Sequence, residues 1–265
     1  MEELLAEVKQ HSRVIEGCEG KIKHASRNAV AHITQAVYLL KHDPLMAMFR
    51  AICAEEEAAT ALICSVKQQG YPKSEYLKEM DHSHKHCVIV LIQVVREWYL
   101  QSSQLDGFPF RNPKFRFADV QGRDGIELGF ELVIDPPSYV VPQPPLGLKE
   151  AGGDLSEKLA AELGKLFQGK KFETIWRRIR DSGSFRNKLL YAGPTGRPGI
   201  PLKAPLFVEQ KIHAVGAILM VLGLIDPWRE PNYYKSDLVS AVIQVMVRLI
   251  ETSNRNSRQR ESGKG

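Results

Sequence analysis

The stretch SRNAVAHITQ (Ser26–Gln35) holds three residue types that can act together on a phosphate ester. Arg27 and Asn28 are adjacent, and His32 follows Asn28 after three intervening residues. On a helix Asn28 and His32 share one face, with Arg27 about 100° away. Histidine can move a proton to or from a ribose 2′-hydroxyl, and arginine can neutralise charge that develops on phosphorus. The pattern therefore indicates either a site that cuts RNA or one turn of an ordinary helix.

A second stretch, FRNKLLYAG (Phe185–Gly193), repeats part of this pattern. Arg186 and Asn187 are again adjacent, but Tyr191 stands where the histidine would be expected. Tyrosine can form hydrogen bonds, yet its ordinary pKa near 10 makes it a poor general base at neutral pH. Neither a GxxxxGK[ST] phosphate loop nor a GxSxG nucleophile turn occurs in the chain.

The triple acid in AEEEAA is the third candidate for chemistry. On a helix Glu56 falls inside the apolar stripe, four residues after Ile52 and three before Ala59, whereas Glu57 points away and Glu55 lies at the edge. A carboxylate on the core side needs a cation or several donors. We expect a partner from Lys85, His86 or Arg27. Either a buried structural ion pair or a functional site would produce this pattern.

The segment DHSHKH (Asp81–His86) is the densest histidine cluster in the sequence. His82 and His86 lie four residues apart and would share a helix face, which suits two ligands of one metal ion, with Glu56 as a further candidate ligand. A di-iron helical bundle requires two Glu-x-x-His pairs and two more carboxylates, and only one pair, Glu79 with His82, is present. We therefore predict no metal or other cofactor, and regard Glu56, His82 and His86 as weak metal candidates beside a plain polar helix start.

Composition places the chain of 265 residues among globular proteins, because 43% of its residues are hydrophobic and 25% are charged. The formal net charge is +5, but the segment from Thr252 to Gly265 supplies +3 of it, with four basic residues and one acidic residue. We expect residues 253–265 to form a disordered basic tail. The folded part is then almost neutral, which gives little support to binding nucleic acid by overall charge.

The location of the protein is predicted from its N-terminus, its cysteines and its apolar runs. The start MEELLAEVKQ is acidic and amphipathic, unlike a secretory leader. The four cysteines occur singly, as in proteins with reduced, buried thiols. No uninterrupted apolar run reaches the roughly 18 residues that would cross a bilayer. We predict a cytoplasmic protein without a membrane partner.

Helical periodicity dominates the first hundred residues. It predicts one helix over Ile22–Leu40, a second from Leu45 to about Gln69 behind Pro44, a short helix over Lys73–Met80, and a long buried helix over Asp81–Gln101. Helices joined by such short turns favour an antiparallel bundle.

The pattern changes over residues of about 106–150, which are rich in proline. The run KFRFADVQ-GRDG-IELGFELVI alternates with period two around a turn and predicts a two-stranded hairpin. Val133–Leu146 is too rich in proline for a helix or a central strand and should run extended over the surface.

Further helices are expected over Leu155–Arg180, from about Pro205 to Leu224, and over Lys235–Thr252, with a turn-rich loop over Asp181–Pro201. The predicted fold is therefore mainly α: a single helical domain over residues 1–252 that carries a β-hairpin and proline-rich insertion.

Several of these segments together resemble the abortive-infection V family, which belongs to the α-helical HEPN domains (higher eukaryotes and prokaryotes nucleotide-binding). They are RNAVAHITQAVYLL, MAMFRAICAEEEAATALI, HSHKH and FRNKLLYAG. The most specific element is the alternation of alanines with the acid triplet, made of Ala47, Ala51, Ala54, Glu55, Glu56, Glu57 and Ala58. The resemblance covers most of the chain outside the insertion and the tail, and it implies a HEPN-like antiparallel helical bundle.

The resemblance also implies a role in antiphage abortive infection, possible RNA cleavage without a metal, and a homodimer whose shared cleft carries an Arg-x4-6-His motif. Arg27, Asn28 and His32 fit that motif by residue type. By position, at the start of a late helix, Arg186, Asn187 and Tyr191 fit better but lack the histidine. Which of the two is the counterpart stays open at this point.

Three functions of different classes remain. The first is a defence ribonuclease, the second a non-catalytic defence protein that binds a phage or host protein, and the third a metal-binding helical bundle. Cleavage that survives chelation, intact RNA, and a retained transition metal would distinguish them in that order.

Overall fold

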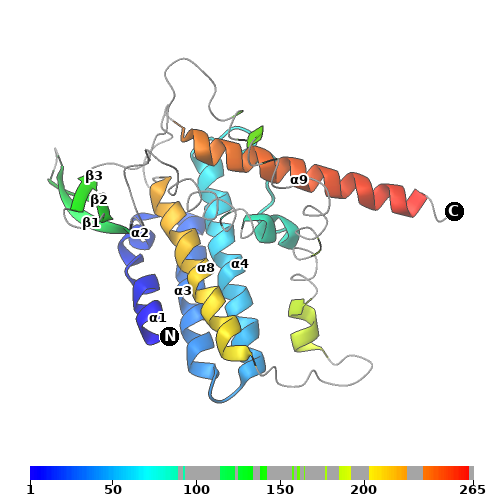
Figure 1. Cartoon of the computed structure of the whole chain (residues 1–265), viewed down its shortest axis with the longest axis horizontal. Helices are drawn as coiled ribbons and strands as arrows, with labels where there is room; N and C mark the ends of the chain where they lie inside the picture. The colour runs from blue at the N-terminus through cyan, green and yellow to red at the C-terminus, as the bar shows by residue number, and fades with distance from the viewer. Residues whose placement is uncertain are drawn as a thin grey trace, which may run out of the picture.

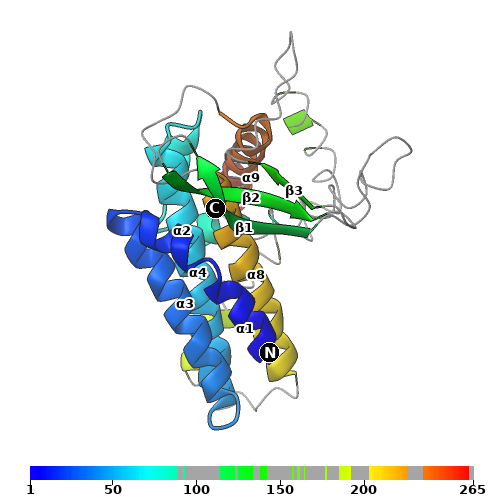
Figure 2. The same ribbon diagram turned by 90° about the vertical axis from the view of Figure 1, so that its left-hand side faces the viewer.

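The computed structural model describes residues 1–88, 92, 114–122, 125–133, 138–141, 157, 160, 161, 164, 177, 185–191, 203–225 and 235–262, with the backbone alone in the strands and beyond residue 252. These residues are mainly helical, so the predicted fold class is confirmed at that level. Three long helices run side by side: α3 (Gly20–Leu39), α4 (Pro44–Gln68) and α8 (Ala204–Leu224), as Figures 1 and 2 show. Two short helices, α1 (Glu2–Lys9) and α2 (Ser12–Gly17), precede them.

Helix α4 lies between α3 and α8 and forms the centre of the core. Asp43 caps its start by accepting a hydrogen bond from the Met46 amide at 3.0 Å, and Pro44 occupies the first turn, where its missing N–H costs nothing. The helix ends just before Gly70, whose positive φ of 66° costs glycine less than it costs any other residue. The sequence predicted both α3 and α4 to within two residues at each end.

Small residues let the helices on both sides approach α4 closely. The alanines of α4 are fully buried, as are the apolar residues that α3 turns toward it. These residues are Ala47, Ala51, Ala54, Ala58, Ala59 and Ala61 of α4, with Ala29, Ile33 and Ala36 of α3. Dispersion contacts between many small, closely packed surfaces therefore hold the centre of the molecule together.

Two predicted helices differ from the structure in part. The segment Lys73–Met80 forms only the 3₁₀ turn η1 (Ser74–Tyr76), because Lys73 takes a left-handed φ of 66° and the amide of Ser74 bonds to the Tyr71 carbonyl three residues back. Residues 82–88 are helical, as predicted for the start of the Asp81–Gln101 helix, and Asp81 accepts from the Ser83 amide at 2.8 Å. Beyond residue 88 only Ile92 of this predicted helix lies among the described residues.

The predicted loop over Asp181–Pro201 contains a helix, since residues 185–190 are helical and the Tyr191 amide bonds to the Asn187 carbonyl at 3.0 Å. Tertiary packing explains the difference. Leu189 is 5% exposed and packs with Met48, Ile52 and Ala204. We call residues 185–191 the Arg186 segment.

Helix α9 (Asp237–Ser262) crosses the end of α4, and its C-terminal half extends away from the bundle (Figure 1). It continues past Thr252, where the sequence predicted its end, so residues 253–262 are helical and not the disordered tail that we expected. Once the buried part of the helix has formed, each further residue adds a hydrogen bond, and Arg, Gln and Glu favour helix. Of the predicted helix over Leu155–Arg180, the structure describes only residues 157, 160, 161, 164 and 177, all helical.

A small antiparallel sheet covers the segment for which we predicted a hairpin. Strand β1 (Lys114–Gly122) pairs with β2 (Gly125–Val133) in the register Lys114 to Val133, and Gly122 faces Gly125 across the turn. Strand β3 (Ser138–Val141) pairs with the other edge of β2. The sheet lies near the end of the bundle that holds α2 (Figures 1 and 2). Part of the segment expected to run extended is thus an edge strand, where flanking prolines are tolerated.

Within the described part of the chain, α8 over Ala204–Gly223 is long and apolar enough to cross a membrane by length and composition, with a mean hydropathy of 1.5. The sequence search for uninterrupted runs missed it because Lys211 and His213 interrupt the apolar residues. Helix α8 packs against α4 and α1 in the bundle, as the core helix of a soluble protein also would, so this finding is weak support for a membrane span.

Candidate functional site

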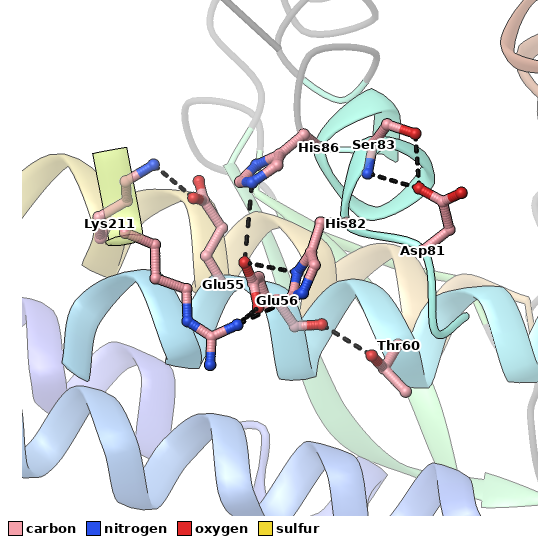
Figure 3. Close-up of polar contacts among 9 residues, drawn as sticks. Glu55, Glu56, Thr60, Asp81, His82, Ser83, His86 and Lys211 are labelled. Atoms are coloured by element: carbon pink, nitrogen blue, oxygen red, sulfur yellow. Dashed lines mark hydrogen bonds and ion pairs between the residues drawn. The ribbon is translucent and has the colours of Figure 1, made fainter. Parts of the chain in front are cut away.

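The acid triplet of α4 organises the polar centre of the molecule. Consecutive residues of a helix point about 100° apart. Glu55 therefore turns toward α8, Glu56 toward the helix of residues 82–88 and the Arg186 segment, and Glu57 toward α3. Each carboxylate meets a different neighbour, as the close-up in Figure 3 shows for Glu55 and Glu56.

Glu55 is the most deeply buried of the three, at 1% exposure, and forms an ion pair with Lys211 of α8. Burial raises the pKa of Glu55, and the adjacent ammonium group opposes that rise. The sequence placed Glu55 at the edge of the apolar stripe, and this was wrong. Helix α8 covers the side of α4 that carries Glu55, outside the apolar stripe. More of α4 is therefore buried than the apolar pattern alone indicated.

Glu56 is buried at 4% exposure, as its place on the apolar stripe predicted. Its Oε2 accepts a hydrogen bond from Nη1 of Arg186 at 3.2 Å. Its Oε1 lies 3.1 Å from Nδ1 of His82 and 3.7 Å from Nε2 of His86 (Figure 3). Of the three partners that the sequence proposed for Glu56, only His86 approaches it, and the main cation is Arg186, which was not considered.

His86 stays neutral in this site. Burial, assisted by the positive charges of Lys211, Lys85 and Arg186, lowers the pKa of His86 to about 4. The carboxylate of Glu56 would favour a protonated ring, but at 3.7 Å it forms no hydrogen bond with Nε2. Burial therefore dominates, and His86 is an uncharged imidazole at neutral pH.

The three weak metal candidates, Glu56, His82 and His86, do lie together. The guanidinium of Arg186 shares their site, bonded to Glu56 and 3.5 Å from Nε2 of His82. A fixed positive charge at this distance opposes binding of a metal cation. Among the described residues, no group of three or more His, Cys, Asp or Glu side chains is arranged to hold a metal ion.

The early Arg-Asn stretch is divided between two surfaces of α3. Arg27 is exposed and donates from Nε to Glu16 of α2 at 2.8 Å, and this pairing lowers the pKa of Glu16 to about 2. Asn28 and His32 face α4 instead, where Nδ2 of Asn28 lies 3.5 Å from Glu57. The structure thus separates Arg27 from the histidine that the motif would join to it.

His32 has a different arginine beside it. Nη1 of Arg50, on α4, lies 3.1 Å from Nδ1 of His32. Burial lowers the pKa of His32, the charges of Arg50 and Arg186 lower it further, and Glu57 opposes them. The charge of Arg186, from the late stretch, therefore acts on His32 of the early one.

Of the three candidate residues in the late stretch, only Arg186 contacts Glu56 and His82. Its guanidinium also lies over the ring of Phe49, 5.5 Å from the ring centre. Asn187 and Tyr191 are exposed, Tyr191 at 68%. We call the group of His32, Arg50, Glu56, His82 and Arg186 the α4 polar cluster.

Arg50 was missed by the sequence analysis, although a signal for it exists. Where two neighbouring helices run antiparallel, a step toward the C-terminus of one helix is matched by a step toward the N-terminus of the other. Asn28 meets Glu57, so His32, one turn later, should lie opposite Cys53, one turn before Glu57; Arg50 precedes Cys53 by three residues on the same face, and its long side chain reaches His32. Predicting this contact required knowing that α3 and α4 pack with these faces together.

Burial leaves the cysteine beside the cluster unreactive. Cys53 is 8% exposed, and burial raises the pKa of its thiol, although Arg186 and Arg50 oppose that effect. Cys53 thus stays protonated at neutral pH and is a packing residue, as predicted for the cysteines of this chain. All four cysteines are free thiols.

The chain was compared with models of protein families, with curated proteins and with solved structures. It matches none of them. The arrangement of side chains in the α4 polar cluster is therefore the main basis for a functional proposal, with the family resemblance of the sequence beside it.

Proposed function

We propose that this protein is an antiphage abortive-infection protein that cleaves RNA without a metal, at the α4 polar cluster. The observation that carries the proposal is the contact of His32 with Arg50 at 3.1 Å, together with a second arginine, Arg186, whose charge also lowers the pKa of His32. A histidine supplies proton transfer, and guanidinium groups supply positive charge for a phosphate. The defence role itself rests on the resemblance of the sequence to the abortive-infection V family.

The proposed reaction is transfer of the phosphodiester to the neighbouring ribose hydroxyl. The 2′-oxygen attacks phosphorus, and its proton passes to His32. The bond from phosphorus to the 5′-oxygen breaks, and that oxygen takes a proton from solvent or from the imidazolium. The products are a 2′,3′-cyclic phosphate and a 5′-hydroxyl. Arg186 stabilises the charge that builds up on the phosphoryl oxygens, so this route requires no metal.

The finer description of the fold belongs to the same proposal. We propose a HEPN-like antiparallel bundle formed around α3, α4 and α8, with residues of about 106–150 as an insertion. A cytoplasmic homodimer, in which two copies of the cluster face one cleft, would follow the pattern of the resembled family.

One observation favours a second candidate, a non-catalytic defence protein that binds a phage or host protein. The Arg186 segment packs on the start of α8, where the rings of Phe185 and Phe207 lie 5.8 Å apart. These two segments also carry three exposed large apolar side chains, namely Leu190 at 39%, Tyr191 at 68% and Leu206 at 50%. Exposed apolar residues on packed segments are a feature of protein-binding surfaces.

Cleavage of RNA by the purified protein in EDTA tests the first proposal. We expect fragments with 2′,3′-cyclic phosphate ends from the wild type and a loss of at least about a hundredfold in His32→Ala and Arg186→Ala. Arg248→Gln is the matched control for Arg186→Ala, because Arg248 is exposed on α9 and its removal changes the net charge by the same amount. Intact RNA with the wild type would reject the ribonuclease proposal and favour the binding protein.

The same preparation tests the metal-binding alternative. Elemental analysis after purification without chelator should find no stoichiometric transition metal. A metal retained by the wild type and lost in His82→Ala with His86→Ala would support a metal-binding bundle instead.

A further inference from the structure

The contact between Arg50 and His32 fixes the state of the imidazole in the free protein. A guanidinium group carries only donors, so at 3.1 Å its Nη1 must donate to the lone pair on Nδ1 of His32. The ring is then neutral, with its proton on Nε2. The one nitrogen that could accept a proton from a ribose hydroxyl is occupied by Arg50.

Arg50 is unusual because it is poorly satisfied where it lies. Among the described residues it forms no ion pair with a carboxylate, and its Nε is buried without a hydrogen-bond partner. A guanidinium normally fills its five donors with carboxylate, phosphate or carbonyl oxygens. The histidine contact uses one of them, so an oxygen-rich anion would satisfy Arg50 better than its present partner.

Arg186 adds a second positive charge to the same place. Its guanidinium lies over the ring of Phe49, the residue before Arg50, and bonds to Glu56 less than two turns farther along α4. Like the charge of Arg50, its charge lowers the pKa of both His32 and Cys53. Arg186 has one carboxylate partner, Glu56, which also lies beside His82 and His86. Glu57, the other nearby acid, lies against Asn28. The site therefore has a surplus of donors over acceptors.

We propose that Arg50 and Arg186 together bind a phosphate group of an RNA backbone, and that this binding draws Arg50 away from His32 and frees Nδ1 to accept a proton. The inference rests on the proposed ribonuclease function and names how its substrate activates the site. In the free protein the base is blocked by its own neighbour. When the phosphate is bound, the phosphate oxygens replace the imidazole as acceptors for Arg50.

The charge balance around His32 gives this mechanism a measurable signature. The groups that face His32 are Arg50 and Glu57 of α4 and Arg186 of the Arg186 segment. In the free protein, burial and the two arginines keep the pKa of His32 below its ordinary value. A bound phosphate neutralises the arginines and releases Nδ1, so the pKa of His32 must rise on binding.

The test is a pH titration of the His32 ring by NMR, first alone and then with a saturating oligonucleotide whose riboses are all 2′-O-methylated. This probe offers phosphodiesters but cannot be cleaved, and inorganic phosphate serves as a second probe that shows whether a free anion suffices. We expect the His32 titration midpoint to move up by at least about one pH unit with the oligonucleotide. An unchanged midpoint at saturation would overturn the inference.

Variants of Arg50 give a second readout. In Arg50→Gln, the pKa of His32 should already lie higher without any probe, and affinity for the oligonucleotide should fall about tenfold or more. Arg248→Gln should leave the His32 titration where it is in the wild type. If Arg50→Gln fails to fold, Arg50→Lys keeps the charge and should still weaken binding, because ammonium cannot form the paired bonds of a guanidinium.

The outcomes separate this inference from the proposed function. A rise in the His32 pKa with the methylated probe, together with intact ordinary RNA, would support the phosphate site and reject cleavage. Cleavage of ordinary RNA without any change at His32, and with full activity in Arg50→Lys, would support cleavage and reject the role of Arg50.

Discussion

Arg186 and Glu56 are 130 positions apart in the sequence, and their side chains meet at 3.2 Å between Nη1 and Oε2. This contact holds the Arg186 segment against α4 and places the guanidinium group where its charge acts on His32. Because Glu56 is buried and Arg186 is 30% exposed in its side chain, one partner is fixed in the core and the other reaches the surface. The pair therefore connects the packing of the bundle to the chemistry that we propose at its edge.

Glu56→Gln should lower the proposed RNA cleavage without removing any group that touches RNA. The glutamine keeps the shape of the side chain but leaves Arg186 without its counter-charge and free to move. We expect a loss of roughly 1 to 2 kcal/mol in the free energy of unfolding, since Arg186 is partly solvated. Activity should fall about tenfold, mainly in kcat. Urea unfolding and initial cleavage rates measure the two effects, and an unchanged kcat would show that Glu56 does not position Arg186.

Leu189→Ala tests the packing that holds the same segment. Leu189 fills a small cluster with Met48, Ile52 and Ala204, and truncating it leaves a cavity beneath the helical turn. A loss of about 2 to 3 kcal/mol in stability is expected if the turn stays folded, and less if it detaches locally. Hydrogen exchange of residues 185–191 distinguishes these cases. Lys188→Ala, on the exposed side of the turn, is the control, and equal exchange in both variants would contradict the packing role of Leu189.

Lys211→Met should be strongly destabilising, because it leaves Glu55 as a buried carboxylate without its partner. We expect a loss of roughly 3 kcal/mol at pH 7. Adding Glu55→Gln to this variant should recover a large part of the loss, since a neutral amide costs less to bury than a charge. Thermal unfolding of the single and double variants measures the coupling. If the double variant is less stable than Lys211→Met alone, the ion pair is not the source of the loss.

Acid should destabilise the fold through its buried histidines. Burial lowers the pKa of both His86 and His11 to about 4, against an ordinary value of 6.5. Between about pH 4 and pH 6.5 these histidines are protonated in the unfolded chain but not in the folded protein. The free energy of unfolding is therefore at its highest above about pH 6.5 and falls as the pH drops toward 4. Each histidine should contribute about 2 kcal/mol of loss between pH 7 and 5. In His86→Gln the slope of stability against pH should be smaller, and a slope equal to that of the wild type would refute the assignment.

Arg27→Ala should have little effect on RNA cleavage, in contrast to His32→Ala. Arg27 is exposed and paired with Glu16 of α2, away from the face of α3 that carries His32. We expect cleavage within about twofold of the wild type. If Arg27→Ala abolishes cleavage as completely as His32→Ala, the early motif acts as a unit and Arg50 does not replace its arginine.

Helical periodicity predicted the local structure well where the chain is strongly amphipathic. The faces of α3 and α4 and the burial of Glu56 follow from residue spacing within one helix. Periodicity contains no information about which segment covers a given face. The burial of Glu55 under α8 and the meeting of Glu56 with Arg186 depend on contacts between distant segments, so a single sequence did not supply them.

The Arg186 segment shows a second limit. Its glycine- and proline-rich continuation favoured a loop, while Arg, Lys and Leu within it favour helix. Packing of Leu189 decides between these tendencies. Spacing within α3 placed Arg27 about 100° from the face of Asn28 and His32, and it pairs with Glu16. Spacing within one helix could not show, however, that Arg50 of α4 lies beside His32.

The three consecutive carboxylates of α4 have one more consequence. Six of the sixteen buried residues of this helix are alanines, and these short side chains alone would allow many angular settings about the helix axis. Glu55, Glu56 and Glu57 contact three different segments, so turning the helix by a single residue step would misplace all of them at once. A one-residue insertion or deletion before Glu55 should therefore abolish the native arrangement even if every apolar contact were preserved, and the triplet acts as the angular reference of the whole bundle.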